Sequence, residues 1–337
     1  MSDAQCNAHK MKRAGNLTES IADLSNLQLA FVKAKRGKQC AKEVLCFTEN
    51  IDVELEKLKN SILSGEVSVG KYHTFEIYDP KQRTICAAAF DERVLHHAIM
   101  NVCNRFFERQ FISDTYATRR GKGQYAAIDT AFKAFSRYDY VLKLDFRKYF
   151  DSVPHTNLKR KLLRIFKDKT LLKIFFKIID SYSEKQGFGL PIGNLTSQYF
   201  ANYYLSDLDH YAKEVLKIPC YVRYMDDILV FEASREKLKY DFECINAFAV
   251  KNVLVLKPPI FSNYIKGIQF LGYKLFRHKI LLNRRSRQRF VNRFYDYERN
   301  LHLGIWSQSE YQRHIMPLVA FTQHSYSKRL RHKVISG

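Results

Sequence analysis

Hydrophobic positions change their spacing along the first third of the chain. From Leu27 to Leu63 apolar residues recur at helical spacing among lysines and glutamates, which predicts a helical opening section. The residues before it, up to about Leu24, are polar and predict a mobile arm. Further along, the pattern predicts a hairpin of strands 72–78 and 83–87 around a turn at Asp79-Pro80, and then a helix over about 91–109.

The rest of the chain mixes short apolar strands with helices. The expected elements are a strand over 140–145, helices over 156–166, 171–182, 196–215 and 235–250, a strand-turn-strand unit over 220–231, and a hairpin over 269–276 and 279–282. After Asn283 arginines crowd onto a helix-like segment that runs to Arg299, with Arg329 and Arg331 beyond it, and this is a candidate phosphate-binding face. The order of elements predicts an α+β layered domain and disfavours a doubly wound parallel sheet.

The composition of the chain indicates what kind of partner it binds. The chain has 337 residues, of which 46% are hydrophobic and 14% aromatic, enough for a core in two or three subdomains. A formal charge of +22 points to an extended polyanion: RNA, DNA or a membrane surface. No apolar run reaches the roughly 18 residues that span a bilayer, so a soluble, cytoplasmic protein is expected. Seven dispersed cysteines without a CxxC pair predict reduced thiols and no structural zinc.

Three carboxylates are the candidate catalytic residues. Asp226 and Asp227 are adjacent at the tip of a tight apolar hairpin, where like charges repel each other unless a cation compensates them. Oxygen ligands favour Mg²⁺ or Mn²⁺ over zinc. Asp145 ends another strand and could complete a two-metal clamp. A Tyr-x-Asp-Asp string alone can arise by chance, so the interpretation depends on the motifs around it.

Four segments in the same order closely resemble the motifs A, B, C and E of the reverse transcriptase family. They are Leu144–Phe150, Leu190–Gln198, Tyr224–Asp227 and Phe270–Tyr273. The resemblance covers roughly residues 27–282 and implies a right-hand polymerase fold with fingers, a palm with an antiparallel sheet, and a short helical thumb. It divides the chain into an N-terminal arm (1–26), fingers with the start of the palm (27–137), the palm with part of the fingers interleaved (138–275), and the thumb (276–337).

The resemblance also implies the activity and its site. An RNA-directed DNA polymerase would bind template RNA, the cDNA or primer, and deoxynucleoside triphosphates, with two Mg²⁺ ions or Mn²⁺ in their place. Asp145 and Asp226 would bridge both ions, Asp227 would support them, and Phe146 is assigned to the metal site as well. The expected nucleotide-binding residues are Lys81, Arg83, Phe150, Ile192, Gly193, Ser197, Gln198, Tyr224 and Met225. The expected primer and template contacts are Arg119, Arg120, Lys122, Phe270, Leu271, Gly272, Tyr273, Arg284, Arg285 and Arg287.

Some of these residues have plainer interpretations. Phe150 lies five residues after Asp145, where a bulky ring would exclude a 2′-hydroxyl and make the product DNA; the alternative is an ordinary core aromatic. Lys81 and Arg83 resemble the basic residues that clamp a triphosphate, but they could be solvated surface charges. After the Asp pair, Lys257 is the lysine near the register of the family's general acid.

Motif B departs from the commonest Gln-Gly-x-x-x-Ser-Pro pattern. It begins with Ile192 and ends in Ser197-Gln198, a form that resembles the reverse transcriptases of diversity-generating retroelements. That resemblance implies errors at template adenines, mutagenic retrohoming, and a small basic oligomeric accessory protein. An apolar Ile192 lacks an amide near the nascent base pair, although it could be a neutral variant. The alternatives are a retron, group II intron-derived or defence-associated enzyme, and a catalytically idle RNA-binding protein.

Overall fold

The computed structural model describes residues 12–78 and 82–335, and the chain divides into two compact units that are described separately. The first unit comprises Met1–Ile112, Arg147–Asp207 and Asn252–Leu254. The second comprises Ser113–Phe146, Leu208–Lys251 and Val255–Gly337. In the described part of the chain no helix is both long and apolar enough to cross a bilayer.

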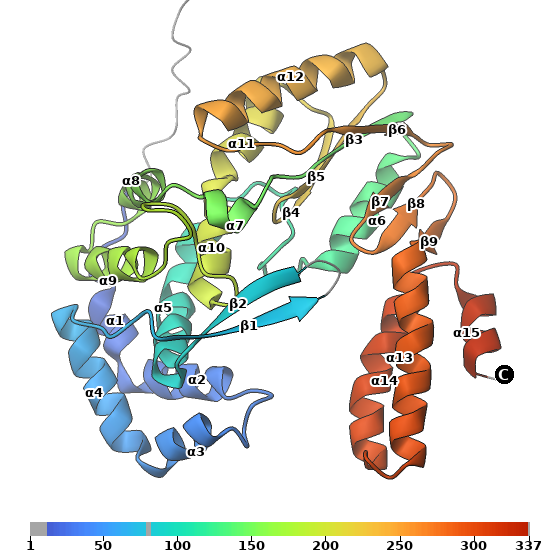
Figure 1. The fold of residues 1–337 in the computed structure, drawn as a ribbon. Helices are drawn as coiled ribbons and strands as arrows, with labels where there is room; N and C mark the ends of the chain where they lie inside the picture. Colours follow the sequence, from blue (N-terminus) through green and yellow to red (C-terminus); the bar gives the residue numbers. More distant parts are fainter. Residues whose placement is uncertain (1–11, 79–81, 336–337) are drawn as a thin grey trace, which may run out of the picture. The chain divides into compact units, whose positions relative to one another are not determined.

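The first unit is mainly helical and is built around α5 (Phe90–Glu108) (Figure 1). Phe107 near the end of α5 is fully buried, and its ring lies 5.6–6.5 Å from the rings of Phe166, Phe175, Phe200 and Tyr203. The aromatic pairs join helices that are far apart in sequence into one core. The other helices of this unit are α1 (Thr18–Ala22), α2 (Leu24–Ala34), α3 (Lys42–Glu49), α4 (Ile51–Ser64), α7 (Tyr149–Ser152), α8 (His155–Ile165), α9 (Lys169–Asp180) and α10 (Leu195–Tyr204).

A two-stranded hairpin belongs to the same unit. β1 (Tyr72–Tyr78) pairs antiparallel with β2 (Gln82–Ala88), as the alternating sequence pattern predicts. Lys81, between these strands in the sequence, lies outside the described residues. Arg83 is exposed on β2.

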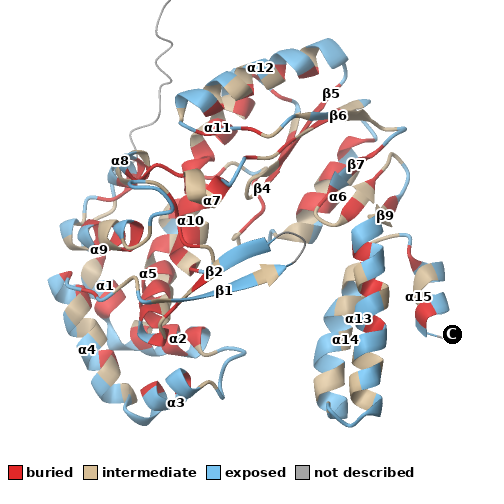
Figure 2. Cartoon of the chain, viewed as in Figure 1, coloured by how far each residue is buried: buried red, intermediate tan, exposed pale blue. Residues whose placement is uncertain are grey.

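The second unit contains a four-stranded antiparallel sheet. Its strand order is β4 (Cys220–Tyr224), β5 (Asp227–Glu232), β3 (Tyr140–Leu144) and β6 (Ile260–Asn263). α12 (Arg235–Lys251) packs against β3 and β5, whereas α6 (Gln124–Ala134) packs against β4. Figure 2 shows β4 and β5 of this sheet as largely buried. Burial on both sides explains why β4 and β5 read as near-continuous apolar runs.

A smaller sheet and three helices complete the second unit. β7 (Ile268–Phe270), β8 (Tyr273–Leu275) and β9 (Ile280–Leu282) share a core with α6 and with Leu229 and Phe231 of β5. α13 (Arg284–His302) buries Ser286, Phe290 and Phe294 at four-residue spacing and exposes most of its arginines. α14 (Gln308–Gln323) and α15 (Lys328–Ile335) follow it.

Three sequence expectations differ from the structure. The polar arm was expected to run to about Leu24, but Leu17, Ile21 and Ala22 are buried at helix α1. The helix expected over 196–215 is broken into α10, α11 (Ser206–His210) and a π-helical turn η1 (Tyr211–Val215), where Tyr211 stacks on Phe248 of α12 at 4.9 Å. Helix α6 and strand β6 were not anticipated. The six cysteines in the described residues are free, as expected; Cys6 lies outside them.

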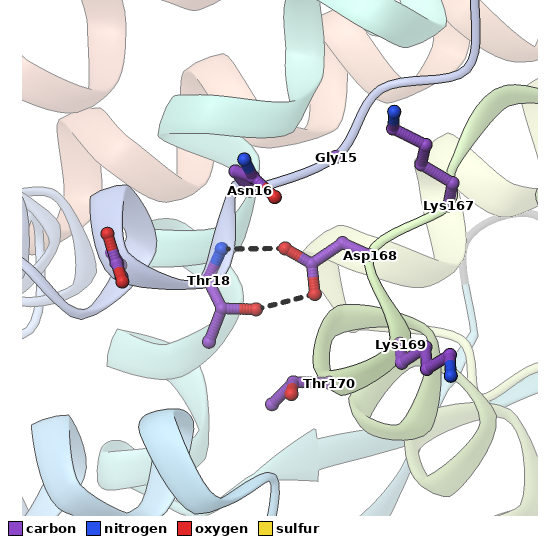
Figure 3. A pocket seen from close by; sticks show the side chains of 8 residues that line it. Gly15, Asn16, Thr18, Lys167, Asp168, Lys169 and Thr170 are labelled. Carbon is purple, nitrogen blue, oxygen red and sulfur yellow. Dashed lines mark hydrogen bonds between the residues drawn. The ribbon is translucent and has the colours of Figure 1, made fainter.

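The start of α1 is held by Asp168, the residue before α9 (Figure 3). The Asp168 carboxylate accepts the backbone N–H groups of Leu17 at 2.7 Å, Thr18 at 3.0 Å and Leu171 at 3.0 Å, together with the Thr18 hydroxyl at 2.8 Å. One side chain therefore caps two helices and draws the N-terminal segment into the core. The hollow beside Asp168 is lined by Gly15, Asn16, Glu19, Lys167, Lys169 and Thr170. The backbone N–H groups of Leu17, Thr18 and Leu171 at the starts of α1 and α9 already donate to the Asp168 carboxylate.

Candidate active site

The pairing of β3 with β5 brings two of the predicted carboxylates together. Leu144 is opposite Ile228, so continuing the register places Asp145 opposite Asp227 where the strands end. Directly opposed residues of antiparallel strands have Cβ atoms roughly 5 Å apart. Long-range strand pairing thus places two of the predicted carboxylates at the same end of the sheet.

A two-residue turn presents the third carboxylate. Tyr224 pairs with Asp227 across β4 and β5, which leaves Met225 and Asp226 as the turn residues. Met225 has a φ of +54°, in the left-handed region that favours glycine. A non-glycine residue in this conformation persists only when its surroundings hold it there, and such strained positions are typical of functional sites.

The carboxylates influence one another electrostatically. Desolvation, followed by the negative charges of Asp145 and then Asp227, raises the pKa of Asp226 to about 6. The charges of Asp145 and Asp227 thus disfavour a third negative charge on Asp226. The site therefore favours a cation.

Two lysines provide part of that positive charge. The Lys257 ammonium group is ion-paired with Asp145 Oδ2, and Lys143 Nζ lies 2.8 Å from Asp227 Oδ1. Lys257 was anticipated from sequence, but Lys143 was not. The available signal was a lysine within an apolar strand two residues before Asp145, a spacing that places both side chains on one face.

The donor set fits a hard divalent cation in its chemistry. All three side chains offer carboxylate oxygens, and Asp145 Oδ1 is buried with no hydrogen-bond partner among the described residues. Within those residues, however, no three His, Cys, Asp or Glu side chains already converge at metal-binding spacing. Asp145, Asp226 and Asp227 are the residues that would hold an ion here, beside Lys257 and Lys143. Phe146 is 1% exposed and has no side-chain ligand atom, so only its backbone carbonyl could bind metal.

The predicted nucleotide-binding residues fall into both units. Tyr224 and Met225 flank Asp226 in the second unit. In the first unit, the Phe150 carbonyl accepts the Leu190 N–H at 2.8 Å, and the Ile192 carbonyl accepts the Cys86 N–H of β2 at 2.8 Å. These bonds bring Phe150, the motif B turn and the strand that carries Arg83 into one region of that unit.

Motif B combines a constrained glycine backbone with the buried hydroxyls of Thr196 and Ser197. Gly193 has a φ of +122°, and a Cβ there would lie 3.0 Å from the Cys86 carbonyl oxygen, so glycine is required. Ser197 is buried, with no hydrogen-bond partner for its hydroxyl among the described residues, whereas Gln198 is half-buried on α10.

Two of the three predicted template contacts near Gly121 are already engaged. Arg119 Nη1 donates to the carbonyl and hydroxyl of Thr115 at 3.0 and 2.8 Å, and Lys122 Nζ donates to the Ser113 carbonyl at 2.9 Å. Both residues therefore brace their own loop. Arg120 is exposed and is the better-placed candidate for a template contact.

Motif E needs a correction. Phe270 is 1% and Tyr273 0% exposed, and the Tyr273 hydroxyl donates to the Phe321 carbonyl at 2.6 Å, so neither side chain can contact the primer. Leu271 and Gly272 form the tight turn between them, both with positive φ, and only this turn remains available. On α13 the predicted contacts Arg284, Arg285 and Arg287 are exposed, as expected.

A comparison with known families identifies the class. The sequence profile described as Reverse transcriptase (RNA-dependent DNA polymerase) matches residues 78–275, more than half of the chain. The chain therefore belongs to the reverse transcriptase family. Membership confirms the α+β right-hand polymerase fold class, and it brings the family's general use of divalent metal ions.

Individual relatives are distant. The chain is 20% identical over 224 residues to the putative COX1/OXI3 intron 1 protein of Saccharomyces cerevisiae, covering 63% of this chain and 27% of that protein. It is 25% identical over 177 residues to protein YkfC of Escherichia coli, covering 48% and 46%. The chain thus spans about a quarter to a half of the length of these curated relatives.

Solved structures of Candida tropicalis telomerase are also similar. The complex with a telomeric RNA fragment gives a TM-score of 0.49 at 12% identity, covering 74% of this chain and 52% of that one. A truncated apo form gives 0.47 at 13% identity, covering 63% and 55%.

Proposed function

We propose that this chain is an RNA-directed DNA polymerase that synthesises cDNA from a template RNA, using deoxynucleoside triphosphates. The observation that carries the proposal is that strand pairing places Asp145 opposite Asp227, with Asp226 beside it in the β4–β5 turn, in a chain of the reverse transcriptase family. The net charge of +22 supports a nucleic-acid partner.

In the proposed reaction, each residue of the site would have a separate role. Two Mg²⁺ ions, replaceable by Mn²⁺, would lower the pKa of the primer 3′-hydroxyl and neutralise the triphosphate. Asp145 and Asp226 would hold the ions, with Asp227, ion-paired with Lys143, in support. The primer 3′-oxygen then displaces pyrophosphate in line at the α-phosphorus. Lys257, beside Asp145, is placed to give the leaving pyrophosphate a proton.

The identity of the product depends on Phe150. Its ring is half-buried, and its backbone is tied to Leu190 at the start of motif B. A bulky aromatic at this offset from Asp145 favours the interpretation as a gate against ribonucleotides. Arg83, exposed on β2, is the remaining described candidate for a triphosphate contact.

Two subfamilies remain as candidates. The form of motif B around Ile192 supports an error-prone enzyme of a diversity-generating retroelement, acting in mutagenic retrohoming with a small basic accessory protein in the cytoplasm. The similarity to a yeast intron protein favours the second candidate, an intron-derived reverse transcriptase. A catalytically idle RNA-binding protein is disfavoured because all three carboxylates of the motifs are present.

Primer extension tests the activity. The purified chain should extend a DNA primer on an RNA template with Mg²⁺, and Asp145→Ala should abolish extension while thermal unfolding stays cooperative. Full extension by Asp145→Ala would refute the assignment. Sequencing the product separates the subfamilies: errors concentrated at template adenines, particularly with the accessory protein present, would support the retroelement enzyme, whereas evenly distributed errors would favour the intron-derived candidate.

A further inference from the structure

Arg223 is a fully buried cation immediately before the Asp226 turn. Its side chain and that of Asp209 on α11 are both 0% exposed. Arg223 Nε donates to Asp209 Oδ1 at 2.6 Å, Nη2 donates to Oδ2, and the Tyr221 hydroxyl donates to Oδ1 at 2.9 Å. The planar guanidinium is thus held by a two-pronged contact, a geometry that lysine cannot reproduce.

The backbone of Arg223 is fixed as firmly as its side chain. Its N–H donates to the Asp114 carbonyl at 3.0 Å, and its carbonyl accepts the Tyr116 N–H at 3.0 Å. Asp114 is itself ion-paired with Lys213 at 3.3 Å. The segment before α6 therefore clamps the edge strand β4 at this one residue.

A third guanidinium contact reaches the turn that carries the catalytic carboxylates. Arg223 Nη1 donates to the Met225 carbonyl at 3.0 Å. Met225 is the residue with the left-handed φ of +54°, and its carbonyl carbon begins the peptide that leads into Asp226. Arg223 is thus a buried hydrogen-bond donor that is held in a fixed orientation, and it contacts the peptide group of the residue with the strained backbone, Met225.

We propose that Arg223, oriented by Asp209, is a positioning residue that holds Met225 in its left-handed conformation and so fixes Asp226 and Asp227 for divalent-metal binding. The inference rests on the proposed polymerase function and deepens it. It assigns control of the site's metal affinity to a buried ion pair that contacts neither metal nor substrate. Hydrogen-bonded supports of this kind typically alter metal affinity about 10- to 100-fold when removed.

The test separates metal binding from folding. The double variant Arg223→Met with Asp209→Asn removes both charges together and leaves no unpaired buried ion. We expect its melting temperature to stay close to the wild-type value, its Mn²⁺ affinity to fall about tenfold, and its kcat for primer extension to fall with the nucleotide KM nearly unchanged. Raised Mg²⁺ should restore part of the rate. Wild-type Mn²⁺ affinity in the folded double variant would overturn the proposal.

A second variant covers the case in which the double variant does not fold. Arg223→Lys keeps the charge beside Asp209 but cannot hold Asp209 and Met225 together. With ¹³C-methyl methionine labelling, which reports on five methionines, the Met225 signal should shift or broaden in Arg223→Lys, and Mn²⁺ should bind more weakly. An unchanged Met225 signal with unchanged Mn²⁺ affinity would overturn the proposal.

The matched control is Lys161→Met in the first unit. Lys161 is also a buried cation, 2.8 Å from Asp207, and it lies outside the proposed catalytic machinery. It should lower the melting temperature and leave Mn²⁺ affinity unchanged. Wild-type protein that neither binds Mn²⁺ nor extends a primer would instead refute the proposed function itself.

Discussion

Lys257 contacts Asp145 twice: its ammonium group is ion-paired with the Asp145 carboxylate, and its backbone N–H donates to the Asp145 carbonyl at 2.8 Å. The two residues are 112 positions apart in the chain. This lysine compensates the charge of the Asp145 carboxylate, and in the proposed reaction it would be the proton donor.

We expect Lys257→Met to slow single-nucleotide incorporation about 100-fold, since general acids typically contribute that much or more, with little change in nucleotide KM. Rapid-quench kinetics on an RNA template would measure it. Lys251→Met, which alters an exposed lysine at the end of α12, is the control and should match wild type. Equal rates for Lys257→Met and Lys251→Met would remove Lys257 from the mechanism.

Charge repulsion among the carboxylates should be visible in stability. Desolvation and two acidic neighbours raise the pKa of Asp226 to about 6. In the metal-free protein at pH 7.5, ionisation of Asp226 therefore lowers the free energy of unfolding. Asp226→Asn should therefore raise the melting temperature of metal-free protein. Added Mg²⁺ should stabilise the wild type but not this variant. Calorimetry that showed the same Mg²⁺ response in both proteins would contradict the site.

Sugar selection should depend on the bulk of Phe150. In Phe150→Ala the space for a 2′-hydroxyl opens, so the ratio of kcat/KM for deoxyribonucleotides over ribonucleotides should drop by at least about tenfold, or roughly 1.4 kcal/mol of discrimination. Incorporation of each nucleotide opposite a defined template base would give the ratio. An unchanged ratio would make Phe150 an ordinary packing residue.

Fidelity should respond to Ile192. Replacing it by Gln restores a side-chain amide beside the Gly193 turn, where it can hydrogen-bond near the nascent pair. We expect fewer misincorporations opposite template adenine, counted by sequencing cDNA from a fixed RNA. Ile192→Leu, which keeps an apolar side chain, is the control. If the two variants produce the same error spectrum as wild type, this residue does not set fidelity.

Stability should also depend on pH through Glu232. This β5 residue is 6% exposed; desolvation, followed by the charge of Asp241, raises its pKa to about 7 from a normal value of 4.5. The folded chain then holds more protons than the unfolded chain between these two values, so stability falls as pH rises through that window. Glu232→Gln should remove the loss and gain up to about 3 kcal/mol at pH 8, with no gain near pH 4.

Urea unfolding of both proteins at the two pH values would measure the difference. Glu243→Gln, which changes an exposed carboxylate on the neighbouring helix α12, should show no such dependence. A Glu232→Gln gain that was the same at pH 4 and pH 8 would show that the effect does not come from ionisation.

Much of the local structure and the central carboxylates could be predicted from sequence. The strands before Asp145 and around Asp226 are short apolar runs that end in acids, and such local patterns survive folding because burial selects them. The basic helix after Asn283 was predicted from arginines crowded on a helix-like segment, and in the structure it buries Ser286, Phe290 and Phe294 at four-residue spacing. The N-terminal segment was not, because its burial depends on Asp168, about 150 residues away.

Tertiary structure alone decided which polar groups act together. Sequence could name Asp145 and Asp227, but only the β3–β5 register sets them opposite each other and brings Lys143 to the same face. Likewise Phe270 and Tyr273 belong to a recognisable motif, yet their burial removes their side chains from any primer contact. The Arg223–Asp209 pair had no local signature at all. Periodic burial is encoded within a few neighbouring residues, whereas ion pairs and strand registers depend on chain segments that meet only after folding.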